Sequence, residues 1–471
     1  MLRAGLVGAA GALAAPWLAA CSTSGGGQGP SATPAVATNM ITLTFQPYTD
    51  AYGFPNGKTL NQLLEQATQS FTAKHPGIRL QMYGTAVNPL AAVIAGSGPD
   101  VPQLQGGGGG ITAWLAGPTV LDLTKYIKQA NVDLTKFAAG QLADVTLDGK
   151  IYGIPNYTGT AGVVVNLSAL DALGLSYPSP NWTYTEWAKL ATSASGVDKG
   201  GKRRYGTTIN GDYFGSGPGA FYYRGWGAHI VDPADPTRCA LDGADAIACA
   251  DFLYNLVYAG VAQFGWVPSN FTQGLTVAPF CWLQSYIIPA ATQWHGFKWD
   301  FWPQPVWPQG SFTMTNPNFF AISVDTPHPD AAWELLHWLT VEPDWQRTLM
   351  RTVLLAPGYL PLWSEWTTVV RQVAPPLASK NLDIFAKYVD SGIMYGGTHF
   401  AHEDGQAKHV LEKWYSDIAA RKFTVQAGFP QMAKEIDALE QAGAIVDGAR
   451  GAATKAFPTN GPVIANVTPG L

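Results

Sequence analysis

The sequence predicts a mixed α/β protein with two large lobes. Its 471 residues exceed the roughly 250–300 residues at which a single hydrophobic core stops growing, so two cores are expected. Apolar and polar residues alternate over 41–45, a helical pattern covers 60–71, and a second extended segment follows at 78–82. A strand, a helix and a strand in direct succession form a β-α-β unit, which implies a parallel sheet.

Local patterns predict the remaining elements in chain order. Leu60, Leu63, Leu64, Ala67 and Phe71 recur at helical spacing, and His75-Pro76-Gly77 ends that helix. Further along the first half we expect helices at 90–94, 111–115 and 121–127, strands at 101–104 and 162–166, and a tight turn at 148–150.

The second half is predicted to be richer in helices. Thr183 and Glu186 fit a capping box at the start of a helix, because the threonine can cap the third amide and the glutamate can reach back. We expect a strand at 319–324, helices at 329–339 and from 343, a mostly helical stretch over 381–439, and a loose tail that begins after 446.

The pattern at the start of the sequence predicts a processing signal. An apolar run over 4–20 ends in Leu18-Ala19-Ala20-Cys21, and residues 22–39 are rich in Ser, Gly and Pro. The run is short for a membrane span of ~20 residues, so a cleaved signal peptide is favoured over a permanent transmembrane helix. Small residues before a cysteine resemble the lipobox of bacterial lipoproteins, which implies cleavage before Cys21 and a diacylglycerol on its thiol. The alternative is an ordinary signal peptide with a chance cysteine.

Composition excludes several classes of partner and site. The net charge is −5 and 13% of residues are charged, and no basic face stands out, so nucleic acid is not an expected partner. The Lys202-Arg203-Arg204 cluster is expected to be a solvated loop. No CxxC pair exists, which excludes a zinc ribbon or a thioredoxin-type site. Cys239 and Cys249 either form a local disulfide or are buried thiols, and Cys281 is expected to be a packed thiol.

Tryptophan is unusually abundant. The chain has 17 tryptophans, and a dense group lies between Trp182 and Trp307. Aromatic rings are first of all core material, but this number is expected to exceed what the core needs. The surplus rings are therefore expected to line a cleft, where flat apolar faces suit the C–H faces of sugars.

Five segments resemble the extracellular solute-binding proteins of ABC importers, of the sugar-binding family 1 type. They occur in the family's order behind the lipobox-like cysteine and span most of residues 41–439. The segments are residues 71–80, residues 96–101 with their Gly-Pro-Asp-Val loop, residues 148–155, residues 166–171 with 182–187, and residues 318–323 with 328–335.

The resemblance implies a periplasmic-binding-protein-like fold. Each of two lobes would be a sheet flanked by helices, with a ligand cleft between the lobes. The implied organisation is a signal peptide at 1–20, a lipidated flexible linker at 21–39, an N-terminal lobe at 40–157 and 319–374, a C-terminal lobe at 158–318 and 375–450, and a loose tail at 451–471.

The same resemblance implies how the protein works. It would act as a monomer outside the cytoplasm, anchored by lipid to the outer face of the cell membrane, and would need no cofactor. A solute that touches both lobes closes them by a hinge motion, because binding favours the state with more contacts. The closed form would then dock on the membrane subunits of an ABC permease.

The resemblance implies six candidate solute contacts, and Tyr395, in Tyr395-Gly396-Gly397, is a seventh candidate from a third segment. For Asp50 and Asp100 the alternative is a loop cap, and for Trp226 and Trp282 it is packing in the core. The seven are Tyr48, Asp50, Asp100, Tyr157, Trp226, Trp282 and Tyr395.

Other signals and functions are weighed and set aside. The Gly run at 106–110 lacks the Gly-Lys-Ser/Thr of a phosphate loop. A cluster at 399–409 (His399, His402, Glu403, Asp404 and His409) matches neither zinc motif, so a solvated helix start is expected and no metal. A non-sugar solute such as a polyamine, peptide or anion is an alternative. A secreted glycoside hydrolase is a further one, although no pair of carboxylates ~5–10 Å apart is identifiable, so an enzyme is not expected.

Overall fold

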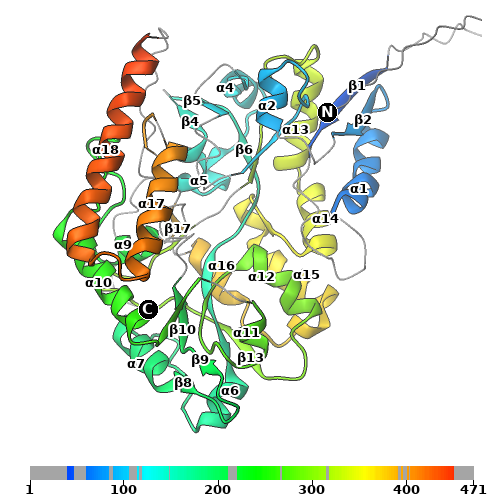
Figure 1. Ribbon diagram of the computed structural model, residues 1–471. Coiled ribbons are helices and arrows are strands. Elements are labelled where there is room, and N and C mark those ends of the chain that lie inside the picture. The colour runs from blue at the N-terminus through cyan, green and yellow to red at the C-terminus, as the bar shows by residue number, and fades with distance from the viewer. Residues whose placement is uncertain are drawn as a thin grey trace, which may run out of the picture. The chain divides into compact units, whose positions relative to one another are not determined.

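The computed structural model (Figure 1) describes residues 40–46, 60–83, 89–105, 114–115, 119–147, 149–209, 220–265, 268–314, 318–390, 394–395, 400–402 and 404–449. The chain divides into a unit at residues 1–39 and a unit at residues 40–471, and all described residues belong to the second unit. Within those ranges, no helix has both the length and the apolar character that a bilayer crossing requires.

Strands and helices alternate through the first two thirds of the chain, and helices dominate its end. The strands are β1 Ile41–Phe45, β2 Ile78–Met82, β3 Gln103–Gln105, β4 Thr146–Leu147, β5 Lys150–Ile151, β6 Ile154–Thr158, β7 Ala161–Asn166, β8 Gly196–Val197, β9 Arg203–Arg204, β10 Thr207–Ile209, β11 Ala262–Phe264, β12 Phe280–Trp282, β13 Trp299–Trp302, β14 Thr313–Met314, β15 Asn318–Phe320, β16 Ala356–Pro357 and β17 Met394–Tyr395. The helices are α1 Leu60–Lys74, α2 Pro89–Ile94, α4 Thr124–Gln129, α5 Ala139–Asp144, α6 Leu167–Leu173, α7 Tyr184–Ala194, α9 Ala220–Gly225, α10 Ala244–Tyr258, α11 Pro268–Thr272, α12 Leu283–Thr292, α13 Pro329–Thr340, α14 Pro343–Val353, α15 Trp363–Val373, α16 Asp383–Asp390, α17 Asp404–Ala419 and α18 Val425–Ala449, with short 3-10 turns at Leu134–Lys136, Leu360–Leu362 and Pro375–Leu377.

The first sheet is built from two stretches of chain that are far apart in the sequence. β1 pairs with β2 in parallel, which confirms the predicted β-α-β unit. A parallel bridge between Phe45 and Val101 connects β1 to the chain that leads into β3. The neighbouring strands follow the order β16-β6-β15-β3, so strands from beyond residue 317 lie beside strands from before residue 159. Helix α13 covers this sheet through contacts with β1, β6 and β15.

The second sheet has β7 at its centre, between β12 and β13, and both pairings are antiparallel. All six residues of β7 are buried, as the apolar run Gly-Val-Val-Val-Asn predicts. Helix α7 begins with the predicted capping box. The Thr183 side chain accepts from the Glu186 N–H, and the Glu186 carboxylate accepts from the Thr183 N–H.

The basic cluster is solvated as expected at Lys202 and Arg203, but Arg203 and Arg204 form β9 rather than a loop and have further bonds. The Arg203 guanidinium donates to the Gly260 carbonyl (2.6 Å), and Arg204 donates to the Ala194 carbonyl (2.7 Å). These carbonyls lie at the ends of α10 and α7, where backbone acceptors have no partner within the helix. A cation at a helix C-terminus also offsets the helix dipole, so both arginines have a structural role.

The last two helices form a hairpin that packs on α10 (Figure 1). Arg421 turns the chain between α17 and α18 with a φ of 60°, and its guanidinium donates to the Tyr258 carbonyl. The hydroxyls of Tyr254 and Tyr258 donate to carbonyls of α17. The hairpin is therefore joined to α10 by side chains that reach in both directions.

The cysteines in the described part of the chain are buried free thiols. Cys239, Cys249 and Cys281 form no disulfide, so the buried-thiol alternative holds for the first two and the packed thiol is confirmed for the third. Burial raises the pKa of each thiol, because the charged thiolate loses its hydration in the core.

Candidate functional site

The first sheet brings several strand ends to one edge. β3 and β6 both pair antiparallel with β15, so they run in the same direction and their carboxyl ends share an edge. β15 begins at that edge, with Asn318 placed between Gln105 and Tyr157. Ligands of open α/β sheets bind outside the carboxyl ends of the strands. This edge is therefore where the fold favours a ligand.

Two buried amides near this edge hold unused acceptors. In the register of the sheet Gln103 pairs with Phe320, two residues from Asn318, so both amides lie on one face of the sheet. Each side chain is at least nine-tenths buried, and among the described residues neither Gln103 Oε1 nor Asn318 Oδ1 has a hydrogen-bond partner. A buried acceptor without a partner costs about 1–3 kcal/mol, which a bound hydroxyl would recover.

A third amide approaches the other side of β6. Gln141 in α5 donates from Nε2 to the Thr158 hydroxyl over 2.6 Å, and both side chains are fully buried. The remaining acceptor, Gln141 Oε1, has no partner in the described ranges. Helix α5 also contacts β17.

The step from β6 to β7 completes the site. Only Gly159 and Thr160 separate the two strands, and the Thr160 hydroxyl has no described partner. The Thr160 carbonyl accepts from the Leu283 N–H (2.9 Å), and Trp282 lies opposite Ala161 in the sheet. We name this group the crossover site. Its members are Gln103, Gln141, Tyr157, Thr158, Thr160, Trp282, Thr313 and Asn318.

The crossover site is chemically neutral. Its members carry amides, hydroxyls and rings, and none of them is an acid or a base that ionises near pH 7. Neutral donors and acceptors in an apolar surrounding recognise hydroxyl groups, whereas a charged solute would need a counter-charge. The buried carboxylate of Asp144 lies three residues after Gln141 in the same helix, outside this group.

Three of the seven predicted contact residues lie on strands that carry this group or pair with it. Tyr157 is paired with Asn318, and Trp282 is paired with Ala161. The main chain of Tyr395 in β17 pairs with Met314, directly after Thr313. Tyr157 and Trp282 are buried, and both belong to the main hydrophobic cluster.

Asp100 lies away from this edge and is occupied by the chain itself. Its carboxylate accepts from the Thr44 N–H (2.7 Å), the Thr44 hydroxyl (2.7 Å) and the Thr326 hydroxyl (2.6 Å). The Asp100 carbonyl accepts from the Ser323 N–H. Asp100 therefore joins β1, β3 and the segment after β15, which fits the loop-cap interpretation.

Trp226 also lies outside the crossover site. It follows α9, and its ring packs at 5.5 Å from Tyr184 and 5.7 Å from Phe252. The ring is half-buried, and its N–H has no partner among the described residues. Its neighbours come from α7 and α10, so the ring contacts are those of core packing.

Most tryptophans proved to be core residues, and the expected surplus in a cleft is not present in the described chain. Trp226 and Trp302 are half-buried, and every other described tryptophan is buried. A dense stack around Trp187 includes Phe280 at 5.2 Å and Trp307 at 5.8 Å between ring centroids. The second sheet and its helices thus use the rings to fill volume. The buried tryptophans are Trp114, Trp182, Trp187, Trp282, Trp294, Trp299, Trp307, Trp333, Trp338, Trp345, Trp363, Trp366 and Trp414.

Several predicted features lie outside the described residues. They are Cys21, Tyr48, Asp50, the Gly run at 106–110, His399 and Glu403. Among the residues that are described, no group of three or more His, Cys, Asp or Glu side chains could hold a metal ion.

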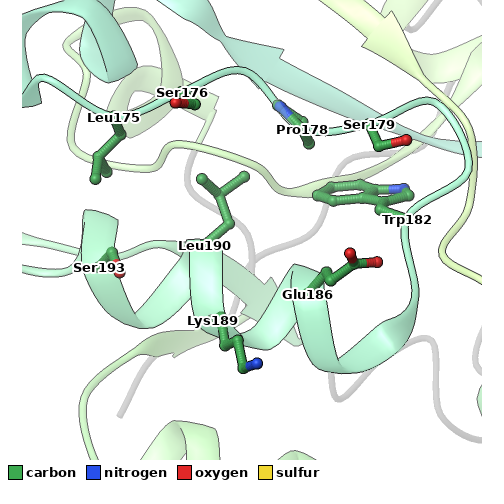
Figure 2. A pocket seen from close by; sticks show the side chains of 9 residues that line it. All are labelled: Leu175, Ser176, Pro178, Ser179, Trp182, Glu186, Lys189, Leu190 and Ser193. Carbon is green, nitrogen blue, oxygen red and sulfur yellow. The ribbon is translucent and has the colours of Figure 1, made fainter.

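A pocket of about 290 Å³ lies elsewhere, between α7 and the loop before it (Figure 2). Leu175 and Leu190 turn toward one another across it, and Lys189 points away. The Thr183 N–H holds the pKa of the Glu186 carboxyl below its usual range, which is the reverse of what a general acid needs. The pocket is lined by Leu175, Ser176, Pro178, Ser179, Trp182, Glu186, Lys189, Leu190 and Ser193.

Sequence reasoning missed the amides of the crossover site. Gln103, Gln141 and Asn318 come from separate segments, and nothing local marks them as neighbours. A usable signal did exist, because Gln103 lies within the predicted strand at 101–104 and Asn318 directly precedes the predicted strand at 319–324. A polar residue in such a position must find a partner or serve a ligand.

Comparison with known proteins identifies relatives. The family model for bacterial extracellular solute-binding proteins matches residues 53–344, which is more than half of the chain. The ABC substrate-binding protein Lmo0181 from Listeria monocytogenes, solved in complex with cycloalternan, is 16% identical with a TM-score of 0.69. That match covers 85% of this chain and 99% of the other.

Two further structures extend the likeness. The sugar-binding protein MalE from Xanthomonas citri is 17% identical, with a TM-score of 0.68 over 87% of this chain and 99% of the other. UgpB from Mycobacterium tuberculosis, in complex with glycerophosphocholine, is 16% identical, with a TM-score of 0.67 over 86% of this chain and 99% of the other. These likenesses confirm the predicted two-lobed α/β fold.

Proposed function

Because this chain belongs to the bacterial extracellular solute-binding proteins, we propose that it captures a sugar or oligosaccharide for an ABC importer. The observation that carries the proposal is the neutral, buried crossover site with its unused amide acceptors. Sugar hydroxyls are donors, and amide oxygens accept from them without a need for charge. Cycloalternan in the Listeria relative is a solute of this chemical class.

Binding is proposed to act by closing the two lobes around the solute. The proposed contacts from the crossover site are Gln103, Tyr157, Trp282 and Asn318, with Tyr395 from β17. Tyr48 and Asp50 are proposed to complete the set from the loop after β1. Asp100 and Trp226 remain predicted contacts. Asp100 already has a structural role through its hydrogen bonds, and Trp226 has one through its ring packing. A solute that touches both lobes favours the closed state, which the membrane subunits of a permease would accept.

The location of the protein is part of the proposal. Cys21 would carry lipid at the outer face of the cell membrane, and residues 22–39 would tether a monomeric receptor beside its permease. One acyl chain binds a membrane only marginally, whereas two hold it firmly. Labelling cells with a fatty-acid analogue tests this: the wild-type protein should be labelled and Cys21→Ser should not. Equal labelling of both would contradict the anchor.

A thermal-shift screen of residues 21–471 tests the solute class. Maltotriose, trehalose, cellotriose and raffinose would be compared with spermidine, a tripeptide and glycerophosphocholine. A sugar that binds only the folded state should raise Tm, and calorimetry should then give its Kd. A shift with an amine, peptide or phosphodiester and none with a sugar would overturn the sugar assignment.

The same preparation tests whether the protein is an enzyme. We propose that it is not, because the crossover site lacks a carboxylate pair and the family binds solutes. The oligosaccharides should be recovered intact after prolonged incubation, as measured by chromatography. Release of shorter sugars would contradict the binding-protein proposal and support the alternative of a glycoside hydrolase.

A further inference from the structure

One side chain joins the strands that leave and re-enter the first sheet. The Thr313 hydroxyl accepts from the Ala161 N–H (3.0 Å) and donates to the Ala161 carbonyl (2.8 Å). Thr313 is fully buried. A single hydroxyl thus satisfies both backbone groups of one residue, at the first position of β7.

The sheet explains why Ala161 needs this partner. β13 pairs with β7 from Asn166 to Val163, where Trp302 ends it. Alternate residues of a strand direct their backbone groups to the same side, so Ala161 directs its N–H and carbonyl to the side that β13 no longer covers. Buried backbone groups without partners are rare because they are costly. Thr313 therefore takes the place of a missing strand at this position.

The same threonine belongs to a strand that pairs with β17. Thr313 belongs to β14, which leads back toward β15 and pairs with Met394 and Tyr395 of β17. Ala161 lies opposite Trp282. The hydroxyl therefore links β7, whose Ala161 lies opposite Trp282, to the β14–β17 pair that contains Tyr395.

We propose that Thr313 is a positioning residue, which fixes Trp282 and Tyr395 relative to Tyr157 through its two hydrogen bonds with Ala161. The inference rests on the proposed function, because it assigns a role in binding to a residue that need not touch the solute. Valine has the shape of threonine but neither donates nor accepts. In Thr313→Val the two hydrogen bonds between the start of β7 and β14 are lost. Trp282 and Tyr395 are then no longer fixed relative to Tyr157.

Three variants separate positioning from general stability. Thr313→Val should weaken binding of the best sugar from the four-member set about tenfold, the size expected when one buried hydrogen-bonded group is lost. Thr313→Ser keeps the hydroxyl and should restore affinity to within about twofold. Thr340→Val is the matched control, since Thr340 is equally buried and its hydroxyl bonds only the Leu336 carbonyl within α13.

The outcomes are distinct when affinity is measured by calorimetry well below each Tm. Thr340→Val should lower Tm and leave Kd unchanged, because it removes a bond within α13 that involves no member of the crossover site. The proposal is overturned if Thr313→Val binds the sugar as tightly as the wild type, or if Thr340→Val loses as much affinity as Thr313→Val does.

Amide exchange keeps the proposal testable if the wild type binds none of the four sugars. Absence of binding to all four sugars would reject the proposed sugar ligand but would not test the role of Thr313. In the ligand-free protein, Thr313→Val should speed exchange of the Ala161 amide, and also of the Leu283 amide, which donates to the Thr160 carbonyl. Unchanged exchange at both amides would show that Thr313 does not hold this junction, and would overturn the inference by itself.

Discussion

Two buried regions of this protein differ in how many of their polar side-chain atoms lack a hydrogen-bond partner within the described chain. The crossover site places amide and hydroxyl groups in an otherwise apolar sheet, and several of their oxygens have no partner among the described residues. The aromatic stack around Trp187 is equally buried but consists of rings packed against rings. Trp187 and Trp307 also keep unpartnered N–H groups, although an indole N–H inside a stack can face the π cloud of a neighbour. In this protein the aromatic rings fill the core, whereas the crossover site is distinguished by several amides and hydroxyls that are unsatisfied in the described ranges and close together in the strand order.

The largest expected effect comes from breaking the stack. Trp187→Ala removes a fully buried ring that contacts Phe252, Phe280 and Trp307. The free energy of unfolding should fall by about 3–5 kcal/mol, because the lost burial is joined by a cavity. Chemical denaturation followed by circular dichroism measures the change.

Trp187→Phe is the control for this prediction. It keeps most of the packing and removes the unpartnered N–H, so the loss of stability should be clearly smaller than for alanine. Folded Trp187→Ala should still bind sugar. Loss of sugar binding in a folded Trp187→Ala protein would mean that the stack belongs to the site, and the distinction between the two regions would fail.

The crossover site should respond in the opposite way. Asn318→Ala removes an acceptor that has no described partner, so stability should change by less than about 1 kcal/mol. Affinity for the best sugar should drop at least about tenfold, because a hydrogen bond to the solute is lost. Calorimetry and thermal denaturation of the same sample measure both quantities.

A satisfied asparagine provides the matched control. Asn166 is buried like Asn318, but its amide accepts from the Ala169 N–H and donates to the Phe271 carbonyl. Asn166→Ala should therefore lose about 1–3 kcal/mol of stability and keep its affinity. If the two alanine variants behaved alike, the unused acceptor of Asn318 would have no special role.

Local patterns in the sequence predicted the elements well. The alternation of 41–45, the helical spacing of 60–71 and the capping box of Thr183 and Glu186 each reflect interactions within a few residues. The strand at 319–324 was predicted too long, since β15 ends at Phe320. Beyond Phe320 the N–H groups of Ala321 and Ser323 still donate to the Pro102 and Asp100 carbonyls, but these bonds lie outside the continuous ladder.

Side-chain partners could not be read from the sequence. Asp100 finds Thr44 and Thr326, which lie 56 and 226 residues away. Arg203 and Arg204 cap helix ends that no local pattern links to them. The amides of the crossover site meet only when separate strands share an edge, so their role depends on topology rather than on residue type.

The smallest expected effect is a change in stability with pH. It comes from a charged side chain in the second sheet, whereas the crossover site contains none. Asp300 in β13 accepts from the N–H groups of Phe301 and Asn381. Burial raises the pKa of its carboxyl, and these hydrogen bonds together with Lys380 and Arg371 offset only part of that shift. The raised pKa means that Asp300 supports the fold fully below its usual value near 3.8, and that this support is lost as pH rises through the folded-state pKa.

Asp300→Asn removes this titration and keeps an acceptor for both N–H groups. The variant should gain stability over the wild type as pH rises from about 3.5 to 6, by about 0.5 kcal/mol because the group is partly exposed and screened. Asp171 provides the opposite sign: Lys298 and Tyr177 lower the pKa of its carboxyl, so its contribution is lost as pH falls. Sugar affinity should stay constant from about pH 5 to 8 in the wild type and in Asp300→Asn, because the proposed contacts in the crossover site do not ionise there. A change of affinity with pH in that range would show that an ionisable group contacts the solute. The contrast between a neutral site and a charged sheet edge would then be wrong.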